Sequence, residues 1–557
     1  MSKWVFKFYD DMTASLIRTC MARPQQGGLA QTGHGTETTP MQSNAAIDLS
    51  AANTADPKHG AATGVAHVDV LIVGAGLSGI GAAFHLQEKC PGQTYAILEG
   101  REAIGGTWDL FRYPGIRSDS DMYTLGYIFK PWSEAKAIAD GPSILKYVRE
   151  TARENGIDNH IRYNHMVRRA SWSTQDARWT VEAEHGPGKE RVSFTCNFLF
   201  MCSGYYDYAQ GYQPDFPGMA SFGGRLVHPQ FWPADLDYAG KRVVVIGSGA
   251  TAVTIVPEMA KTAAHVTMLQ RSPTYVVSRP AEDGVANWLR AKLPAKLAYS
   301  LARWKNVLMT MFFFNMARKQ PAKVKAQILS MVKHELGPDF DVKTHFTPTY
   351  NPWDQRLCLV PDSDLFASLK GGTSSVVTDH IDTFTATGIR LKSGAELPAD
   401  VIVSATGLKL IPVGGMEVVV DGKPVDMGKT VTYKGMMYSD VPNMASAVGY
   451  TNASWTLKAD LTCEYVCRLL NHMKAQGLAY CTPRRTDEDD AAEPFLDLAS
   501  GYIQRSAAVM PKQGARAPWK LYQNYFLDLM TLRFGSIRDN SMVFSKAKPA
   551  PQRAAAE

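Results

Sequence analysis

Apolar segments that run directly into glycine-rich turns occur at two places in the chain. Residues 68–73 (VDVLIV) are followed by GAGLSG and then by a stretch rich in small side chains. Residues 243–246 (VVVI) are followed in the same way by GSGATA. A buried strand, a glycine turn and a helix, in that order, begin the βαβ unit that binds nucleotides. The pattern therefore predicts an α/β protein with two Rossmann-like dinucleotide-binding domains.

The first turn has the spacing Gly74-x-Gly76-x-x-Gly79. Gly74 permits a tight turn, Gly76 lets the backbone approach a pyrophosphate, and Gly79 lets helix and strand pack closely. The helix N-terminus offers free N–H groups and a positive dipole to the phosphates. The next apolar segment ends in Glu99, whose carboxylate can accept hydrogen bonds from ribose hydroxyls. We expect FAD here, because a chance glycine turn would lack the strand, the helix and the acid.

The second turn, Gly247-x-Gly249-x-x-Ala252, is followed by a strand that ends in Arg271 and Ser272 instead of an acid. An Arg beside a Ser suits the 2′-phosphate of NADPH, whereas a carboxylate suits a free 2′-hydroxyl. The alternative is that Arg271 is a solvated surface cation. We expect NADPH at this turn.

Two further apolar segments end in glycine and flank the second unit, at residues 198–204 (FLFMCSG) and 400–407 (DVIVSATG). They predict where the chain leaves the FAD domain and returns to it, so that the NADPH domain is inserted in the FAD domain. The predicted parts are a disordered leader over 1–66, an FAD-binding domain over 67–205 and 385–557, an NADPH-binding domain over 206–275 and 345–384, and a helical insertion over 276–344. The leader is rich in Gly, Thr, Ala and Ser, which indicates disorder and an early start codon.

Composition narrows the class of protein. The formal charge of +6 and the absence of a Lys/Arg run argue against nucleic-acid binding. No apolar run approaches the length of about 18 residues that a membrane span needs, and charged residues interrupt the N-terminus where a signal peptide would lie. The eight cysteines form no CxxC pair, which indicates reduced thiols, no dithiol centre and no metal site. We therefore expect a cytoplasmic protein.

The helical insertion contains the apolar run VLMTMFFF at residues 307–314, with Arg303, Lys305, Arg318 and Lys319 on either side of it. The first interpretation is a buried core helix. The second is an interfacial helix that touches lipid, which would make the protein peripheral on the inner face of the cell membrane.

Three motifs resemble those of Baeyer–Villiger monooxygenases. They are Phe222-x-Gly224-x-x-x-His228-x-x-x-Trp232-Pro233, GGTWDLFRYPGIRSD at residues 105–119, and YNPWDQRLCLVP at residues 350–361. Related flavin monooxygenases and N-hydroxylases have a similar motif but usually end it in Tyr or Phe, so Trp232-Pro233 favours the Baeyer–Villiger group. Three independent motifs make an accidental match implausible. The resemblance covers roughly residues 68–544. Three stretches, residues 106–127 (GTWDLFRYPGIRSDSDMYTLGY), 434–444 (KGMMYSDVPNM) and 449–461 (GYTNASWTLKADL), look most like the ethionamide-activating branch of that family.

The resemblance implies roles for individual residues. Besides the first turn, the residues implied to contact FAD are Gly106, Thr107, Trp108, Asp119 and Tyr123. The active-site Arg of the family falls on Arg356, with Asp119 as its partner; the alternative is a purely structural ion pair. His228 is implied to couple the domains at the linker, so we expect a hinge residue and not an acid or base, with Trp232 packing beside it. Many members have Lys before the active-site Arg; here Gln355 leaves the choice of NADPH over NADH more dependent on Arg271 and Ser272.

The chemistry that the resemblance implies is oxygen insertion. NADPH reduces FAD, the reduced flavin takes up O2 to give a C4a-peroxyflavin, and this species converts a ketone into an ester or oxygenates the sulfur of a thioether or thioamide. The expected substrates are small and apolar. Two alternatives stay open, a flavin monooxygenase that acts only on nitrogen or sulfur, and a membrane-attached NADPH oxidase or electron-transfer flavoprotein.

Overall fold

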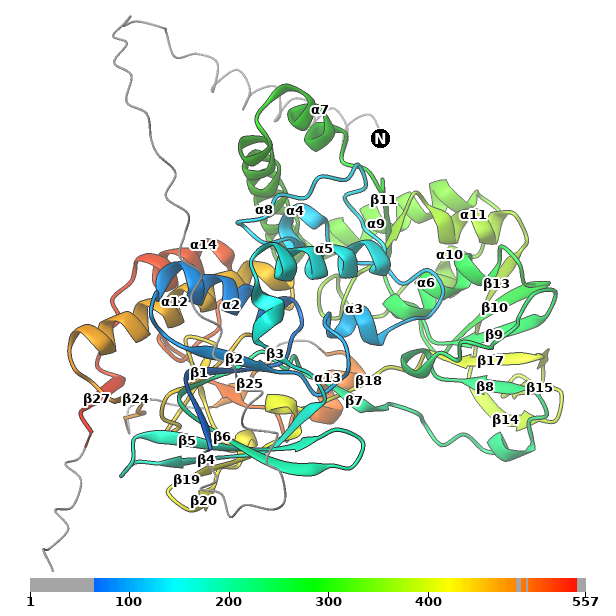
Figure 1. The fold of residues 1–557 in the computed structure, drawn as a ribbon. Coiled ribbons are helices and arrows are strands. Elements are labelled where there is room, and N and C mark those ends of the chain that lie inside the picture. Colours follow the sequence, from blue (N-terminus) through cyan, green and yellow to red (C-terminus); the bar gives the residue numbers. More distant parts are fainter. Residues whose placement is uncertain (1–64, 487–491, 497–498, 548–557) are drawn as a thin grey trace, which may run out of the picture. The chain divides into compact units, whose positions relative to one another are not determined.

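Two sheets organise the part of the chain that the computed structural model describes, which is residues 65–486, 492–496 and 499–547 (Figure 1). The leader expected over residues 1–66 lies outside the described residues, apart from its last two, and the first strand begins at Ala66. The central strands of both sheets are apolar on both faces, which requires cover on each side.

The first sheet has β1 (Ala66–Val73) near its centre, paired in parallel with β2 on one side and β6 on the other. In spatial order it contains β20 (Lys423–Pro424), β19 (Glu417–Val420), β4 (His165–Ser173), β5 (Arg178–His185), β6 (Glu190–Met201), β1, β2 (Tyr95–Leu98) and β3 (Ile161–Arg162). β23 (Met444–Ser446) also pairs with β6 in parallel, and β22 (Met437–Tyr438) and β21 (Thr432–Tyr433) continue from it. The parallel part is the predicted nucleotide-binding sheet, and β4 to β6 form an antiparallel extension.

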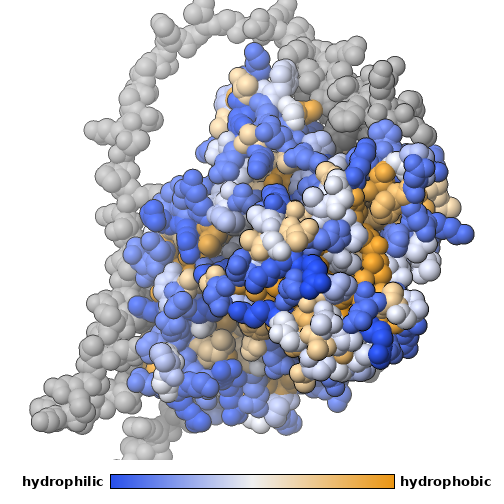
Figure 2. Space-filling model, turned by 90° about the vertical axis from the view of Figure 1, so that its right-hand side faces the viewer, coloured by the Kyte–Doolittle hydropathy of each residue, from blue (hydrophilic) through white to orange (hydrophobic). Residues whose placement is uncertain are grey.

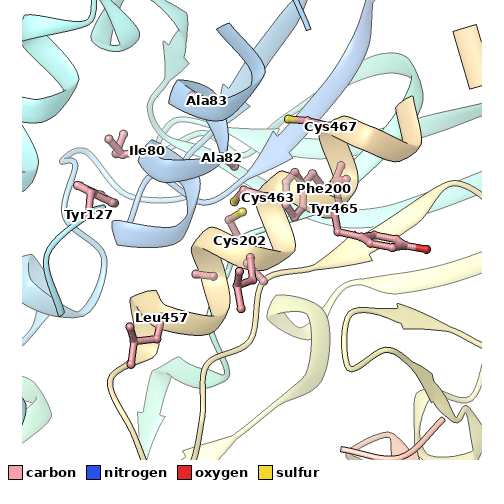
Figure 3. Packing of buried hydrophobic residues seen from close by; sticks show 14 of the residues in the cluster. Ile80, Ala82, Ala83, Tyr127, Phe200, Cys202, Leu457, Cys463, Tyr465 and Cys467 are labelled. Carbon is pink, nitrogen blue, oxygen red and sulfur yellow. The ribbon is translucent and has the colours of Figure 1, made fainter. Parts of the chain in front are cut away.

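Two helices, α2 (Leu77–Lys89) and α12 (Trp455–Ala475), pack against each other beside this sheet. Ala82 and Ala83 of α2 are fully buried, and such small side chains let α12 approach closely. Figure 3 shows Cys463 of α12 in the same cluster as Phe200 of β6. The other helices of this part are α3 (Thr107–Leu110), α4 (Met122–Leu125), α5 (Gly141–Glu154), α13 (Gly501–Ser506) and α14 (Tyr525–Asp528), the last followed by a π-helical turn over Leu529–Phe534.

The second sheet is wholly parallel, in the order β13 (Ser374–Thr378), β10 (His265–Gln270), β9 (Arg242–Ile246), β17 (Val401–Ser404) and β8 (Arg225–Val227). The chain enters it after β6 and leaves it before β19, so the second unit is inserted in the first, as predicted. The predicted boundary at residue 385 is wrong, because the buried strand β17 pairs with β9 and belongs to the second sheet. A small sheet of β14 (Ile381–Thr385), β15 (Gly388–Leu391) and β16 (Glu396–Pro398) also packs on this unit.

The helical insertion contains α7 (Gly284–Lys292), α8 (Ala295–Lys319), α9 (Pro321–Leu336) and α10 (Val342–His345). Its predicted start at residue 276 is four residues early, because β11 (Val276–Arg279) is a strand that pairs with β12 (Cys358–Pro361). α11 (Asp364–Lys370) then leads back to β13. The remaining two-stranded sheets are β7 (Tyr206–Gly211) with β18 (Leu408–Leu410), β24 (Tyr480–Pro483) with β27 (Met542–Ser545), and β25 (Glu493–Pro494) with β26 (Lys512–Gln513).

Arg303, one of the cations beside the apolar run, is buried on the inner face of α8, which agrees with the first interpretation, a core helix. Its guanidinium donates to the carbonyl oxygens of Tyr123 and Gly126 at 2.9 Å and 2.8 Å, and to the Asp460 carboxylate at 3.4 Å. Its neighbour Lys305 is only 11% exposed and pairs with Asp283. Two of the four cations thought to flank the apolar run therefore anchor α8 to the rest of the protein, because a buried charge needs a partner.

No helix in the described ranges is long and apolar enough to cross a membrane. The face seen in Figure 2 is largely hydrophilic, with hydrophobic residues gathered in separate patches, as is usual for a globular surface.

We predict that Arg303→Ala lowers the free energy of unfolding by about 3 kcal/mol or more, because it leaves the buried Asp460 carboxylate without its countercharge. Arg318→Ala on the same helix is the control; its pair with Asp354 is half exposed and is worth at most about 1 kcal/mol. Thermal melting of the two purified variants distinguishes them. Equal melting temperatures would contradict a structural role for the buried pair.

Candidate functional site

The first glycine turn has the geometry that its spacing predicts. Gly74 has φ +104°, and a side chain there would lie 2.6 Å from the carbonyl oxygen of Cys202. A side chain at Gly79 would lie 1.9 Å from the carbonyl oxygen of Gly74. Gly76 caps α2 without a side-chain hydrogen bond, which leaves the first N–H groups of the helix for an anion, as a pyrophosphate requires.

Glu99 directly follows β2 and is buried beside this turn. Its carboxylate accepts from the backbone N–H of Ala75 at 2.7 Å and from that of Arg101 at 3.0 Å. Burial raises the pKa of Glu99. The two backbone bonds fix the orientation of the carboxylate at the end of β2, and its remaining lone pairs can accept from hydroxyl groups.

The second turn repeats this geometry. Gly247 has φ +137°, and a side chain there would lie 2.4 Å from the carbonyl oxygen of Ala405. Gly249 caps α6 (Ala250–Met259) without a side-chain bond and faces open space, while Ala252 is fully buried. Arg271 is exposed after β10. Both turns therefore fit a dinucleotide, and only the second has a cation at the end of its second strand.

The Gly105-Gly106 segment lies against the first turn. The Cα of Gly106 is 3.6 Å from where a Gly76 side chain would begin. Thr107 starts α3 and contacts the Tyr208 hydroxyl at 3.4 Å, and Trp108 is partly buried on the core beside it.

Tyr123, which the resemblance also implied to contact FAD, has a different environment from Gly106, Thr107 and Trp108. It is buried in α4, and its ring lies 5.9 Å from that of Tyr299 of α8. Its hydroxyl has no hydrogen-bond partner within the described part of the chain. The structure thus brings Gly106 against the first turn, whereas Tyr123 packs toward the helical insertion.

Arg356 and Asp119 form an ion pair, with Nη2 2.6 Å from Oδ2. The carboxylate holds the pKa of Arg356 well above its ordinary value, so the guanidinium is permanently charged. Tyr205, Tyr206 and Tyr502 lie near the guanidinium. Burial raises the pKa of Tyr502 to about 12, so this phenol stays neutral and can donate a hydrogen bond.

The ion pair lies where the two units meet. Four residues before Asp119, a side chain at Gly115 would lie 3.1 Å from the carbonyl oxygen of Thr254 in α6. Two residues after Arg356, the Cys358 thiol points to the carbonyl oxygen of Ser248 in the second turn at 3.8 Å. Tyr205 and Tyr206, in contrast, follow β6 of the first sheet. A cation is thereby held between the two predicted nucleotide sites.

His228 bridges the two segments that link the units. Its Nδ1 accepts from the Gln230 N–H at 3.2 Å, so Nε2 carries the proton that it shares with the Gly407 carbonyl oxygen at 3.3 Å. A side chain at Gly211 would lie 2.1 Å from the imidazole ring. Burial lowers the pKa of His228, which keeps the ring neutral. These contacts support the expected hinge position.

The other residues of that motif have packing roles. Phe222 and Trp232 are partly buried against the core of the second unit. A side chain at Gly224 would lie 2.4 Å from the carbonyl oxygen of Asp400 and 2.6 Å from the Phe222 ring. Gln355 directly precedes Arg356 and is half-buried.

The sequence did not reveal the tyrosines around Arg356. Tyr205 and Tyr206 belong to the run GYYDY after β6. Two adjacent aromatic residues at the end of a strand were the one feature of the sequence that could have indicated a site there. Tyr502 comes from α13, far along the chain, and no pattern linked it to the site. Within the described ranges, no group of three or more His, Cys, Asp or Glu could hold a metal.

Comparison with known proteins identifies the family. A flavin-binding monooxygenase-like profile matches residues 137–409, and an NAD(P)-binding Rossmann-like profile matches residues 72–135. The chain belongs to the FAD-containing monooxygenases, because relatives of that description are 50% to 55% identical to it. It is 55% identical over 487 residues to the FAD-containing monooxygenase EthA of Mycobacterium tuberculosis (strain H37Rv), covering 87% of this chain and 99% of that protein. It is 50% identical over 493 residues to the probable FAD-binding monooxygenase AlmA of Acinetobacter baylyi, covering 87% and 98%.

Solved structures confirm the predicted fold class. An oxidized steroid monooxygenase bound to NADP has a TM-score of 0.68 at 22% identity, covering 86% of this chain and 100% of that chain. The polycyclic ketone monooxygenase of Thermothelomyces thermophila has a TM-score of 0.67 at 17% identity, covering 90% and 92%. A structure of OTEMO in complex with FAD and NADP has a TM-score of 0.62 at 24% identity, covering 75% and 88%. The two expected cofactors, FAD and NADP, are both bound in the OTEMO structure, and NADP is bound in the steroid monooxygenase structure.

We predict that Arg271→Ala raises the KM for NADPH by on the order of tenfold or more, because a charge-assisted hydrogen bond to the 2′-phosphate is lost. The KM for NADH should change by no more than about twofold, since NADH has no such phosphate. Arg390→Ala, an exposed cation on β15, is the control. Equal effects on both coenzymes would exclude contact between Arg271 and the 2′-phosphate.

We predict that His228 contributes to the acid sensitivity of the fold. Because its pKa is lowered in the folded state, its contribution to stability is present above the ordinary pKa of about 6.5 and is lost as the pH falls through the lower folded value. The melting temperature of the wild type should therefore fall more than that of His228→Leu when the pH is lowered from about 7 to about 5. His380→Leu, at an exposed position, should retain the wild-type pH profile. A pH profile of His228→Leu that matches the wild type would contradict the prediction.

Proposed function

We propose that this FAD-containing monooxygenase uses NADPH and O2 to insert one oxygen atom into apolar ketones, giving esters, and that it also oxygenates the sulfur of thioethers and thioamides. The observation that carries the proposal is the Arg356–Asp119 ion pair between the two glycine turns. A fixed cation at that place suits a reaction in which negative charge develops on oxygen beside both cofactors.

The residues present fit the two cofactors. The first turn with Glu99 would hold FAD, and the second turn with Arg271 would hold NADPH. When bound, NADPH supplies the hydride and FAD supplies the redox chemistry with O2. The protein's own contribution is to place these groups and to stabilise charge.

Arg356 acts through its positive charge and not as an acid or base, because a guanidinium does not lose its proton in this setting. When an oxygen nucleophile adds to a ketone, negative charge develops on the carbonyl oxygen. A preorganised donor aimed at that charge typically contributes about 3 to 4 kcal/mol. Asp119 holds the guanidinium in one orientation, which limits the reorganisation needed during the reaction.

The surroundings of Arg356 favour apolar substrates. Three aromatic residues, Tyr205, Tyr206 and Tyr502, lie near the charge, and aromatic side chains are typical of sites for apolar ligands. The name of one structural relative, a polycyclic ketone monooxygenase, supports a ketone substrate. The free, buried thiols of the described residues support a reducing, cytoplasmic compartment.

We predict that Arg356→Ala abolishes ester formation while NADPH oxidation continues and releases H2O2. Loss of one preorganised donor commonly costs a hundred- to a thousand-fold in rate, so ester formation should fall by about that much or more. Arg356→Lys should recover little, since a flexible ammonium does not reproduce the fork. Asp119→Asn should show the same defect in milder form, because the guanidinium remains but loses its anchor.

NADPH loss, H2O2 and ester are measured in one reaction with a panel of ketones and thioethers under labelled O2. Arg318→Ala, a surface variant, is the control for folding and flavin content. Sulfoxide from the wild type without any ester would establish the alternative, an oxygenase of sulfur or nitrogen alone. A near-normal ester yield from Arg356→Ala would refute the role given to Arg356.

A further inference from the structure

An exposed apolar stripe runs along the outer face of α8. Leu297, Leu301, Trp304 and Leu308 are 49%, 38%, 38% and 48% exposed, and they recur at the three- and four-residue spacing of one helix face. The opposite face is buried and includes Arg303. At 1.5 Å per residue, the stripe is about 16 Å long.

A second exposed apolar group adjoins the stripe. Phe526, Leu527, Met530 and Phe534, in α14 and the π-helical turn that follows it, are 53%, 42%, 48% and 66% exposed. The Trp304 ring of α8 lies 5.9 Å from the ring of Tyr525 in α14, so the two groups meet. We refer to the eight exposed residues of the two groups together as the apolar face. Single exposed apolar residues are common, whereas a continuous group of this kind marks an interaction surface.

The helical insertion that carries the stripe is strongly basic. Residues 284–334 contain ten Lys and Arg and no Asp or Glu, whereas the whole chain has 59 basic and 53 acidic residues. Lys292 and Lys296 are exposed at one end of the stripe, and Lys319 and Lys323 are exposed at the other. Among the described residues, no carboxylate forms an ion pair with any of these four lysines.

We propose that the apolar face docks on an anionic lipid bilayer, with the α8 stripe in the boundary between headgroups and acyl chains and the four lysines among the headgroups. An in-plane helix with an apolar face and a basic polar face binds membranes in this way. Each lysine near an anionic surface adds to the attraction, and its long stem lets the charge reach the headgroups. The pattern of charge selects a bilayer over a second copy, because two copies would bring two sets of unpaired lysines together.

The docked helix also contacts the region of the candidate active site. The Phe314 ring of α8 lies 5.5 Å from that of Trp353, three residues before Arg356. Trp353 itself has φ +72°. An apolar substrate dissolved in the bilayer would thus leave it close to the segment that bears Arg356. This last step rests on the proposed function, whereas the docking itself does not.

The test is flotation of the full-length holoenzyme with vesicles of phosphatidylcholine alone, or of phosphatidylcholine and phosphatidylglycerol in equal parts. The wild type should float with the anionic vesicles, and high salt should release much of it. The double variant Leu301→Ser/Leu308→Ser should bind about tenfold less or weaker still. Lys296→Glu/Lys319→Glu should lower binding to the anionic vesicles by a similar factor.

Matched controls lie outside the face. Val543→Ser replaces an apolar residue of 45% exposure on β27, and Lys423→Glu replaces an exposed lysine on β20; both should bind as the wild type does. All variants should keep their flavin and their melting temperature, since the altered side chains are exposed. Flotation needs no turnover, so its result is independent of the oxygenation assay.

Two results would overturn the proposal. One is equal flotation of the wild type and Leu301→Ser/Leu308→Ser. The other is a concentration-dependent dimer of the wild type that these two substitutions dissociate, with no vesicle binding, because the apolar face would then be covered by a second copy. Sedimentation of both proteins without lipid provides that measurement.

Discussion

The arrangement of the molecule depends on one repeated close approach, between a glycine turn and the carbonyl oxygen at the end of a neighbouring strand. Gly74 meets Cys202 in the first unit and Gly247 meets Ala405 in the second, with room for no side chain in either case. Each of these strand ends is also where the chain crosses between the units. The contact that shapes each nucleotide turn therefore also fixes the point where a linker between the units begins. Directly beyond these two points, β7 of one linker pairs with β18 of the other.

The position of Arg356 follows from this crossing. The chain leaves β6 through Tyr205 and Tyr206, so two of the three tyrosines near the guanidinium come from the linker itself. The segment that bears Asp119 packs on α6, and the segment that bears Arg356 contacts the second turn. Holding a charge in such a place costs desolvation energy, which the carboxylate at 2.6 Å offsets. A relative movement of the two units would thus move the cation with respect to one of the nucleotide sites.

Local patterns predicted the parts of the fold that local physics determines. The two glycine turns, the acid at Glu99 and the crossing segments were evident, because each requires a particular residue at a particular spacing. The domain boundary at residue 385 was wrong because the apolar segment at residues 400–407, although evident, does not show which sheet it joins; as β17 it pairs with β9 of the second sheet. The pairing of strands distant in sequence is a tertiary property, and periodicity does not contain it.

The same limit explains why α8 was only half understood from its sequence. Its cations were interpreted together as residues on either side of the apolar run, yet Arg303 and Lys305 pair with Asp460 and Asp283, whereas Lys319 is exposed. The period of the helix separates them, but which side faces the protein depends on Asp460 and Asp283, which come from other elements. Once Arg303 is anchored, the rotation of α8 is fixed, and the Leu301–Leu308 stripe must face away from the core. The buried ion pair thus determines which surface the helix presents, and the apolar face is a consequence of it.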